Sequence, residues 1–292
     1  MSVRSPLPFA AATLGIAVYS GMDAIMKGLS IAHGAYAAVL WRSVAGVVLT
    51  GVPFVLGRRR WPGRAALRLH LARGLAAGAS VLLFFWGLAR VPMAKGVAVT
   101  FLAPLLAIFL AGALLGERVR RAAIAGSAVA CLGVLAIAAG EVQARAPAAA
   151  VLGTLACVAA SILYAGSLVL LRQQAQVADP LEVALFTSLV IALAMLPAAP
   201  WLAGWPPRSA LVPVAGAAVL GTMSALLIAW AYARAEAQVV AVTEYTAFVW
   251  SALFGWLVFG ERVGGWTIMG AVLITAGCLL AVKGRPATEA AA

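Results

Sequence analysis

The stretch AKGVAVTFLAPLLAIFLAGALLGERV, residues 94–119, decides the fold of this 292-residue chain, because a copy of it lies 144 positions further on. The Gly-Glu-Arg-Val block at 116–119 recurs without a gap at 260–263, and the Ala-Arg pair at 89–90 recurs at 233–234. Fifteen residues between positions 80 and 135 are identical in the two copies, including a tryptophan. The chain is therefore an internal duplication.

Composition indicates what was duplicated. Hydrophobic residues make up 64% of the chain and charged residues only 10%, too little polar surface to cover a water-soluble globule. Arg, Pro, Gly and acidic residues divide it into ten apolar runs, each about as long as a helix that crosses a bilayer. The predicted spans are 7–29, 36–57, 69–90, 94–115, 120–140, 149–171, 181–203, 210–233, 238–259 and 264–283.

These runs are apolar on all sides, whereas the strands of a membrane barrel would alternate in polarity over short segments. The sequence therefore predicts an all-α polytopic membrane protein with ten transmembrane helices. We expect residues 1–145 to form a first five-helix repeat and residues 146–292 a second. Because five is an odd number, the second repeat is expected to be inverted relative to the first.

Positive charge predicts the orientation, since cytoplasmic loops of membrane proteins carry an excess of Lys and Arg. With a cytoplasmic N-terminus, thirteen basic residues fall on the cytoplasmic side and five on the other. The thirteen are Arg4, Arg58, Arg59, Arg60, Arg64, Arg68, Arg118, Arg120, Arg121, Arg172, Arg234, Lys283 and Arg285; the five are Arg90, Lys95, Arg145, Arg208 and Arg262. We therefore expect both termini in the cytoplasm, and the net charge of +12 does not indicate a nucleic-acid surface.

Residues that could hold a metal or a cofactor are few. Cys131, Cys157 and Cys278 lie in separate spans, without the close spacing of a metal or disulfide site. His33 and His70 lie at predicted helix ends, where an interfacial side chain is the simpler interpretation and a proton relay the alternative. The sequence has no nucleotide-binding glycine loop and no catalytic motif, so we expect no cofactor, no metal and no enzymatic activity.

Charged residues inside the spans are candidates for function, because an ionisable group in hydrocarbon needs a partner or a water-filled cavity. Asp23 and Lys27 are four residues apart on one helix, which would allow them to neutralise each other. Arg42 lies about six residues into the second span. It could line a pathway there, or its long side chain could extend to the membrane surface.

Glu244 is the strongest candidate for a functional acid. It lies about seven residues into the ninth span and aligns with Thr100, while its neighbour Tyr245 aligns with Phe101. Equivalent points of inverted helices meet near the pseudo-twofold axis at mid-membrane, where transporters of this build bind substrate. The alternative is that Glu244 caps a helix break or pairs with Arg42.

Aromatic residues are candidates for the walls of an apolar cavity at the same depth. Trp86 and Trp230 occupy equivalent positions, and Tyr164 aligns with Tyr19 at an offset of 145. Packing and interfacial anchoring are the alternative for each of them, because these roles explain most aromatic residues in membranes.

Other repeated features have structural interpretations. The Gly-Glu-Arg segments at 116–118 and 260–262 are expected to end helices and anchor them in the headgroups. Gly112, Gly116, Gly126 and Gly133 would allow helices to approach closely. Pro104 is expected to kink the fourth span; Phe248 stands at the equivalent position, so the copies need not bend alike.

These motifs resemble the EamA-type branch of the drug/metabolite transporter superfamily. The similarity rests on two five-helix copies, on segments 89–119 and 233–263, and on the glycine pairs at 126/133 and 270/277. It covers nearly the whole chain and implies a ten-helix secondary transporter in the inner membrane of a bacterium. Among ten-helix members, the chain is most similar to bacterial exporters of amino acids, including aromatic ones.

The resemblance implies export of a small amphipathic metabolite, an amino acid first of all, by alternating access. A sugar nucleotide or a cationic drug is the alternative within transport, and a membrane enzyme or an assembly factor is the remote one. The implied partners are a small-molecule substrate and the lipid bilayer. The candidate substrate-binding residues are Asp23, Lys27, Arg42, Trp86, Thr100, Phe101, Tyr164, Trp230, Glu244 and Tyr245.

Overall fold

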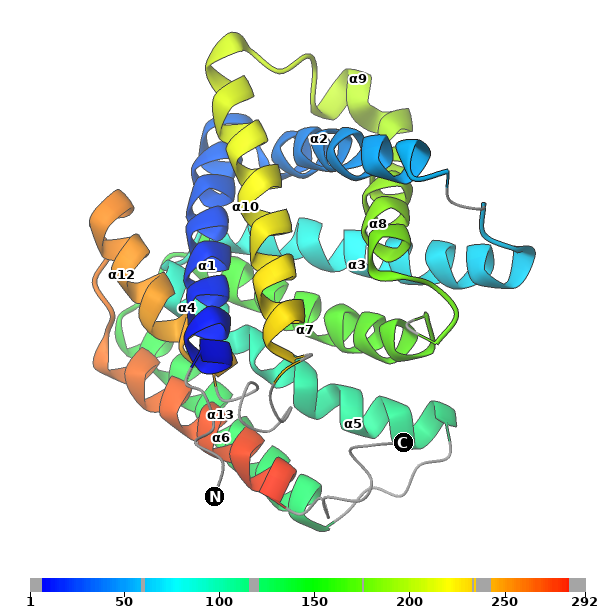
Figure 1. Cartoon of the computed structure of the whole chain (residues 1–292). Coiled ribbons are helices and arrows are strands. Elements are labelled where there is room, and N and C mark those ends of the chain that lie inside the picture. The colour runs from blue at the N-terminus through cyan, green and yellow to red at the C-terminus, as the bar shows by residue number, and fades with distance from the viewer. Residues whose placement is uncertain are drawn as a thin grey trace.

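The computed structural model describes residues 7–58, 61–115, 121–174, 176–232, 234 and 243–283. Among these residues the regular elements are all helices, which agrees with the predicted all-α class (Figure 1). Eight helical segments are long and apolar enough to cross a membrane, and two shorter apolar helices accompany them. The chain is a multi-pass membrane protein.

The helices follow the predicted spans, with ends displaced by a few residues. In the first copy they are α1 (Leu7–His33), α2 (Ala35–Leu56), α3 (Arg64–Leu88), α4 (Met93–Thr100), α5 (Leu102–Leu115) and α6 (Arg121–Gln143). In the second copy they are α7 (Ala148–Gln174), α8 (Pro180–Met195), the 3-10 helix η1 (Leu196–Ala198), α9 (Ala199–Leu202), α10 (Arg208–Tyr232), α12 (Ala247–Phe259) and α13 (Gly265–Lys283).

The fourth span of the first copy is interrupted, as its proline predicts. Pro104 has no N–H to donate to the carbonyl of Thr100, and its ring crowds that carbonyl. The helix α4 consequently ends at Thr100, and α5 begins at Leu102. Phe101 stands at the break between them.

The second copy is interrupted at the equivalent place without a proline. Tyr245 and Thr246 form a turn directly before α12, and the Thr246 hydroxyl donates to the carbonyl of Thr243 over 2.6 Å. Hydrogen bonds from a side chain to a nearby backbone carbonyl compete with the backbone hydrogen bonds of a helix. The two copies therefore break at aligned positions although only one of them carries a proline there.

Helices of the two copies pack on each other in exchanged pairs. The first helix of the first copy, α1, runs along the third helix of the second copy, α10, and α7 runs along α3 in the same way. Likewise α12 packs on α1, while α4 and α5 pack on α7. Figure 1 shows the yellow helix α10 beside the blue helix α1, and the red helix α13 beside α6.

The contact between α6 and α13 is made at the predicted glycines. A β-carbon on Gly133 would lie 2.6 Å from the Gly270 carbonyl oxygen, and one on Gly270 would lie 2.6 Å from the Gly133 oxygen. A β-carbon on Gly277 would overlap the carbonyl oxygen of Gly126. Gly270 and Gly277 are the copies of Gly126 and Gly133, so the contact is reciprocal. The close approach expected at Gly126 and Gly133 is confirmed.

Of the two Gly-Glu-Arg segments, the one at 116–118 lies outside the described residues. The one at 260–262 follows α12, which ends at Gly260 with a left-handed φ of 66°. Its glutamate does not anchor in the headgroups as expected, because the Glu261 side chain is turned inward to Lys27. That contact is part of the site described next.

Candidate functional site

Asp23 is a buried acid in the second half of α1. The residue is 5% exposed, and its Oδ1 atom has no hydrogen-bond partner in the part of the chain that the structure describes. Burial of a carboxylate without a partner is unfavourable by several kcal/mol. The position is therefore suited to a group that arrives from outside the chain and donates to this oxygen.

Arg42 of α2 brings positive charge to Asp23. It interacts electrostatically with Asp23 and with Tyr19, which lies one helical turn before the acid. A β-carbon on Gly221 of α10 would lie 3.4 Å from Nη2 of Arg42, so the guanidinium lies against this part of α10. This position inside the bundle favours the pathway interpretation of Arg42 over an extension to the membrane surface.

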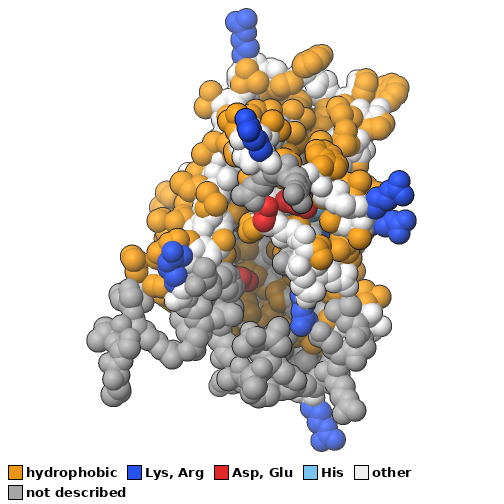
Figure 2. Space-filling model, turned by 45° about the vertical axis from the view of Figure 1, so that its right-hand side comes forward, with side chains coloured by type: hydrophobic (Ala, Val, Ile, Leu, Met, Phe, Trp, Pro, Cys, Tyr) orange, Lys and Arg blue, Asp and Glu red, His pale blue; other side chains and the backbone are white. Residues whose placement is uncertain are grey.

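Two aligned tyrosines face each other across the middle of the bundle. Tyr19 in α1 and Tyr164 in α7 interact with each other, and Asp23 interacts with both. They nevertheless remain 44% and 45% exposed. Side chains that are close together near the middle of their helices and still exposed border an open space between those helices. Figure 2 shows a mainly hydrophobic face with a shaded hollow, in which one acidic patch is visible.

Glu244 and Arg73 extend the polar cluster on the side of Tyr164. Both interact electrostatically with the tyrosine, and the exposed Glu244 lies just before the break that precedes α12. Arg73 of α3 donates from Nη1 to the hydroxyl oxygen of Thr187 over 2.6 Å. Acids and bases from α1, α2, α3 and the segment before α12, and so from both copies, thus surround one region.

The aromatic residues at the two helix breaks meet, as the alignment of the copies predicts. The rings of Phe101 and Tyr245 are 5.3 Å apart at 82°, an edge-to-face contact. The thiol of Cys278 donates to the Phe101 carbonyl over 3.2 Å. The hydroxyl of Thr100 donates a hydrogen bond of 2.7 Å to the backbone carbonyl of Val97, one turn earlier in α4.

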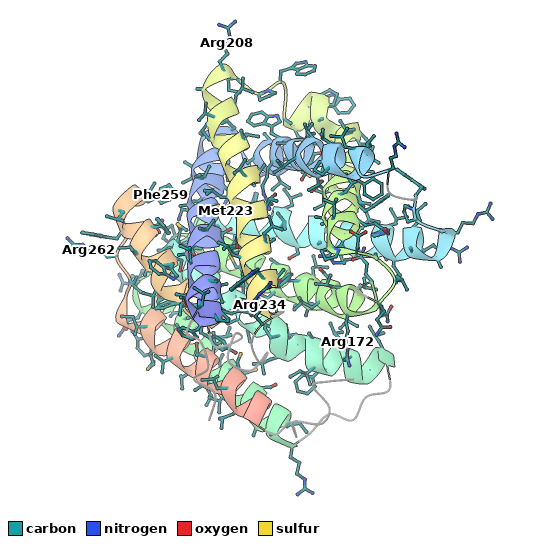
Figure 3. All side chains as sticks on the ribbon, viewed as in Figure 1. Arg172, Arg208, Met223, Arg234, Phe259 and Arg262 are labelled. Carbon is teal, nitrogen blue, oxygen red and sulfur yellow. The ribbon has the colours of Figure 1, made fainter. Side chains whose placement is uncertain are left out.

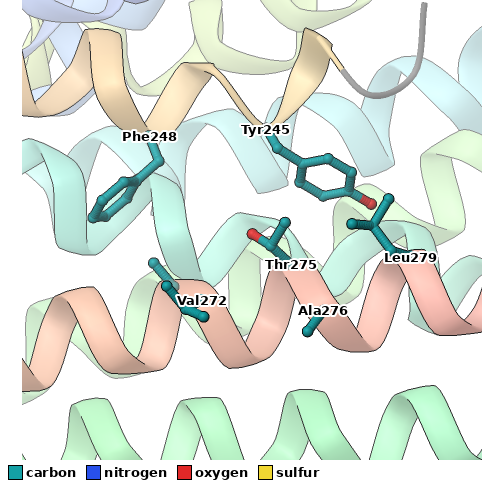
Figure 4. A pocket seen from close by; sticks show the side chains of 7 residues that line it. Tyr245, Phe248, Val272, Thr275, Ala276 and Leu279 are labelled. Carbon is teal, nitrogen blue, oxygen red and sulfur yellow. The ribbon is translucent and has the colours of Figure 1, made fainter. Parts of the chain in front are cut away.

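A cavity of about 330 Å³ opens beside this aromatic contact. Figure 4 shows Tyr245 and Phe248 above it and the side chains of α13 below it. Its walls are apolar except for the hydroxyl groups of Tyr245 and Thr275. The lining residues are Tyr245, Phe248, Ala271, Val272, Thr275, Ala276 and Leu279.

Trp86 and Trp230 lie at the ends of their helices and not near the middle, so their part in a mid-membrane site stays a prediction. Each occupies the last turn, Trp86 in α3 and Trp230 in α10. Each is covered by the arginine four residues on: Arg90 lies 3.6 Å from the Trp86 ring centroid and Arg234 lies 4.4 Å from that of Trp230. Helix ends with stacked Trp and Arg are typical of interfacial anchors.

Lys27 does not neutralise Asp23, although the spacing of four favoured that pair. Its ammonium group binds the carboxylate of Glu261, just beyond the end of α12. The fold brings the two together from positions 234 apart in sequence. Figure 3 labels Phe259 and Arg262, which lie on either side of this glutamate at the end of the orange helix.

Sequence reasoning missed three functional candidates: Tyr19, Arg73 and Glu261. Tyr19 is the copy of Tyr164, so the alignment alone could have included it. Arg73 lies about nine residues inside α3, a depth at which a charge needs a partner or a cavity. For Glu261, the available signal was the buried Lys27 on the same side of the predicted membrane, which required an acid.

The described residues contain no group of three or more His, Cys, Asp or Glu side chains that could hold a metal ion. The polar cluster is instead a mixture of carboxylate, guanidinium and phenol groups between apolar helices. Such an arrangement can bind and release a charged small molecule. A duplicated helical membrane protein with polar groups buried between its copies is the build of a transporter.

Comparison with known proteins identifies the family. The sequence pattern of the EamA-like transporter family matches residues 8–139 and again residues 151–283. The chain belongs to this family, which makes it a transporter and not an enzyme.

Two curated relatives are similar over most of their length. The pseudopaline exporter CntI of Pseudomonas aeruginosa is 28% identical over 278 residues, 92% of this chain and 93% of the relative. A probable terminal-alkyne amino-acid exporter of Streptantibioticus cattleyicolor is 29% identical over 274 residues, 89% and 88% of the two chains. A solved crystal structure shares the fold, with a TM-score of 0.62 at 23% identity over 94% of this chain and 97% of the other.

Proposed function

We propose that this protein is a secondary transporter that exports small zwitterionic, amphipathic metabolites, amino acids among them, by alternating access. The observation that carries the proposal is the buried Asp23 carboxylate: its Oδ1 accepts no hydrogen bond from any described residue, and Arg42 interacts with it electrostatically. A carboxylate suits a substrate ammonium group, and a guanidinium suits a substrate carboxylate. One α-amino acid carries both.

The apolar surroundings support an amphipathic substrate. Phe101 and Tyr245 provide aromatic surface at the helix breaks, and a mainly apolar cavity opens beside them. Tyr164 and Glu244 would border the same substrate on the opposite side of the polar cluster. The two relatives that are named as exporters, one of them of an amino acid, support the direction of transport and the substrate class.

The architecture that we propose for this function is a pair of inverted five-helix repeats, residues 1–145 and 146–292, in a bacterial inner membrane. The duplication, the exchanged helix pairs and the reciprocal glycine contact all support it. The excess of Lys and Arg on the side of the termini supports a cytoplasmic location for both ends. The polar cluster would then lie on the axis between the repeats.

Efflux from proteoliposomes tests the function. The purified chain is reconstituted, and the vesicles are loaded with labelled amino acids, a sugar nucleotide or an organic cation. We expect amino acids with apolar side chains to leave fastest. Asp23→Asn and Arg42→Gln each remove a charge and should lower that efflux about tenfold or more, since a hydrogen bond to a charged group is lost.

Arg208→Gln is the matched control, because Arg208 is exposed at the start of α10 and lies far from the cluster (Figure 3). All variants must show the elution profile and thermal stability of the parent protein. Parent efflux rates in both Asp23→Asn and Arg42→Gln would remove the cluster as the substrate site. Efflux of the sugar nucleotide or of the cation alone would contradict the proposed substrate class.

A further inference from the structure

Lys27 and Glu261 form a buried ion pair between the two copies, near the end of the bundle where α1, α3 and α12 finish. Lys27 is 3% exposed, and its ammonium binds the Glu261 carboxylate and donates to the carbonyl of Val91 over 2.6 Å. The ring of Phe259 lies 5.1 Å from the same nitrogen. The partners of this one cation therefore come from both copies.

The second carboxylate oxygen of Glu261 caps a helix. It accepts a hydrogen bond of 2.7 Å from the backbone N–H of Met93, the first residue of α4. The first N–H groups of a helix have no partner inside the helix, and the helix dipole favours negative charge at that position. Glu261 thus binds α1 with one oxygen and α4 with the other.

Two glycines allow Glu261 to reach these partners. Gly260 has a φ of 66°, a left-handed conformation that ends α12 and reverses the chain. Gly255 leaves the space that the carboxylate occupies, because a β-carbon there would lie 2.7 Å from Oε2 of Glu261. We call the contacts among Lys27, Val91, Met93 and Glu261 the lock.

The lock holds the outer ends of two half-helices whose inner ends meet at the proposed substrate site. The first, α4, runs from Met93 in the lock to the break at Phe101. The second, α12, runs from the break at Tyr245 to the lock at Glu261. Because Phe101 and Tyr245 are in ring contact, a displacement of either half-helix at the centre is transmitted to the lock.

We propose that the lock closes one end of the transport pathway and must open in each transport cycle. The proposal rests on the alternating access proposed above and assigns Glu261 as a positioning residue. Interfaces of this kind have discrete arrangements, and loss of the contacts that hold one arrangement shifts the population toward the other. A broken lock should therefore favour the conformation that is open at this end.

Accessibility of a cysteine within the lock tests the proposal. Met93 is fully buried, so Met93→Cys is the reporter, in a chain in which Cys131, Cys157 and Cys278 are alanine. A membrane-impermeant maleimide is applied first from the face of the termini and then from the opposite face. The reporter should react from the face opposite the termini.

Two changes break the lock by different means. Lys27→Met together with Glu261→Gln removes both charges at once and leaves no uncompensated charge. Gly255→Ala keeps both charges and displaces the Glu261 carboxylate sterically. Gly264→Ala is the matched control, because a β-carbon there would have no atom of the described residues within 4 Å.

We expect labelling of the reporter to be about fivefold faster or more in both lock variants, and unchanged in the control. Unchanged labelling in both variants, with normal folding, would overturn the lock. Faster labelling of both lock variants, together with a parent chain that exports no amino acid, would retain the lock and reject the proposed substrate. Export by the parent with unchanged labelling of the variants would retain the function and reject the lock.

Discussion

The two ends of the bundle join the copies by different chemistry. At one end the ammonium of Lys27 binds the carboxylate of Glu261. At the opposite end, Nε2 of His70 in α3 lies 2.8 Å from Oε1 of Glu182 in α8. In Figure 1 the turn after α12 lies at the left, whereas the turns before α3 and α8 lie at the right.

The His70 end is held by a packed side-chain network. His70 is 1% exposed, its Nδ1 bonds the amide of Gln174 in α7, and its ring stacks on Phe186 at 4.5 Å. The sequence placed His70 at a helix end as an interfacial side chain, and this is wrong. The ring is buried because α7 and α8 cover α3 at that point.

The difference between the ends shows where movement is coupled to the site. The helices that meet at His70 are α3, α7 and α8; α3 and α7 are continuous, and α8 passes into η1 and α9 only after Met195. Those that meet at the lock include α4 and α12, which break at the centre. A substrate that contacts Phe101 or Tyr245 therefore acts more directly on the lock than on the His70 end.

The largest effect is expected from Glu261→Gln alone. It leaves the ammonium of Lys27, which is 3% exposed, without its counter-ion. Removal of one partner of a buried ion pair costs about 3–5 kcal/mol, whereas removal of both charges is far less unfavourable. We expect the free energy of unfolding in mixed micelles to fall by that amount and to recover in the double variant with Lys27→Met.

Glu182→Gln at the opposite end provides the comparison. An imidazole can bond to a neutral amide in its uncharged form, so no fixed charge is left in the core. We expect a smaller loss, about 1.5–3 kcal/mol, from the hydrogen bond to a charged group. If Glu261→Gln and Glu182→Gln lowered the free energy of unfolding equally, the chemical difference between the two ends would have no energetic consequence.

The sequence predicts the helices and their central contact because both follow from patterns that can be read along the chain. Apolar runs separated by Arg, Pro and Gly locate the spans, and alignment of the copies places Phe101 opposite Tyr245. The glycine contact between α6 and α13 follows from the same alignment. A duplication predicts contacts because residues at aligned positions of the two copies are expected to lie near each other, close to the axis that relates the copies.

The charge pairs could not be predicted in this way. A spacing of four on one helix favoured Asp23 as the partner of Lys27, and the sequence contains no competing local signal. The competition is decided in three dimensions, by the reversal at Gly260 and by the space over Gly255. The result is the central feature of the candidate site: Lys27 is neutralised by Glu261, whereas Oδ1 of Asp23 has no hydrogen-bond partner among the described residues.

The copies also contact each other through α6 and α13, and we expect this contact to stay intact while either end of the bundle opens. Gly277→Ala places a methyl group on the carbonyl oxygen of Gly126 and must separate the two helices. We expect the free energy of unfolding to fall by about 1–3 kcal/mol, the usual cost of overpacking. Gly166→Ala in α7 is the control, since no atom of the residues that the structure covers lies within 4 Å of the added carbon. Equal stability of the two variants would contradict the close contact.

The smallest effect is expected from the two tryptophans, one at each end of the bundle. Trp86→Ala and Trp230→Ala each remove a ring beneath an arginine, at 3.6 and 4.4 Å from the ring centroid. An exposed cation–π contact contributes about 0.5–1 kcal/mol, so both variants should lose a similar, small amount of unfolding free energy. Efflux of large apolar and of small amino acids should fall in the same proportion, because neither ring lies in the central cluster. A selective loss of large apolar substrates in one variant alone would instead place that tryptophan in the substrate pathway and make the two ends unequal in function.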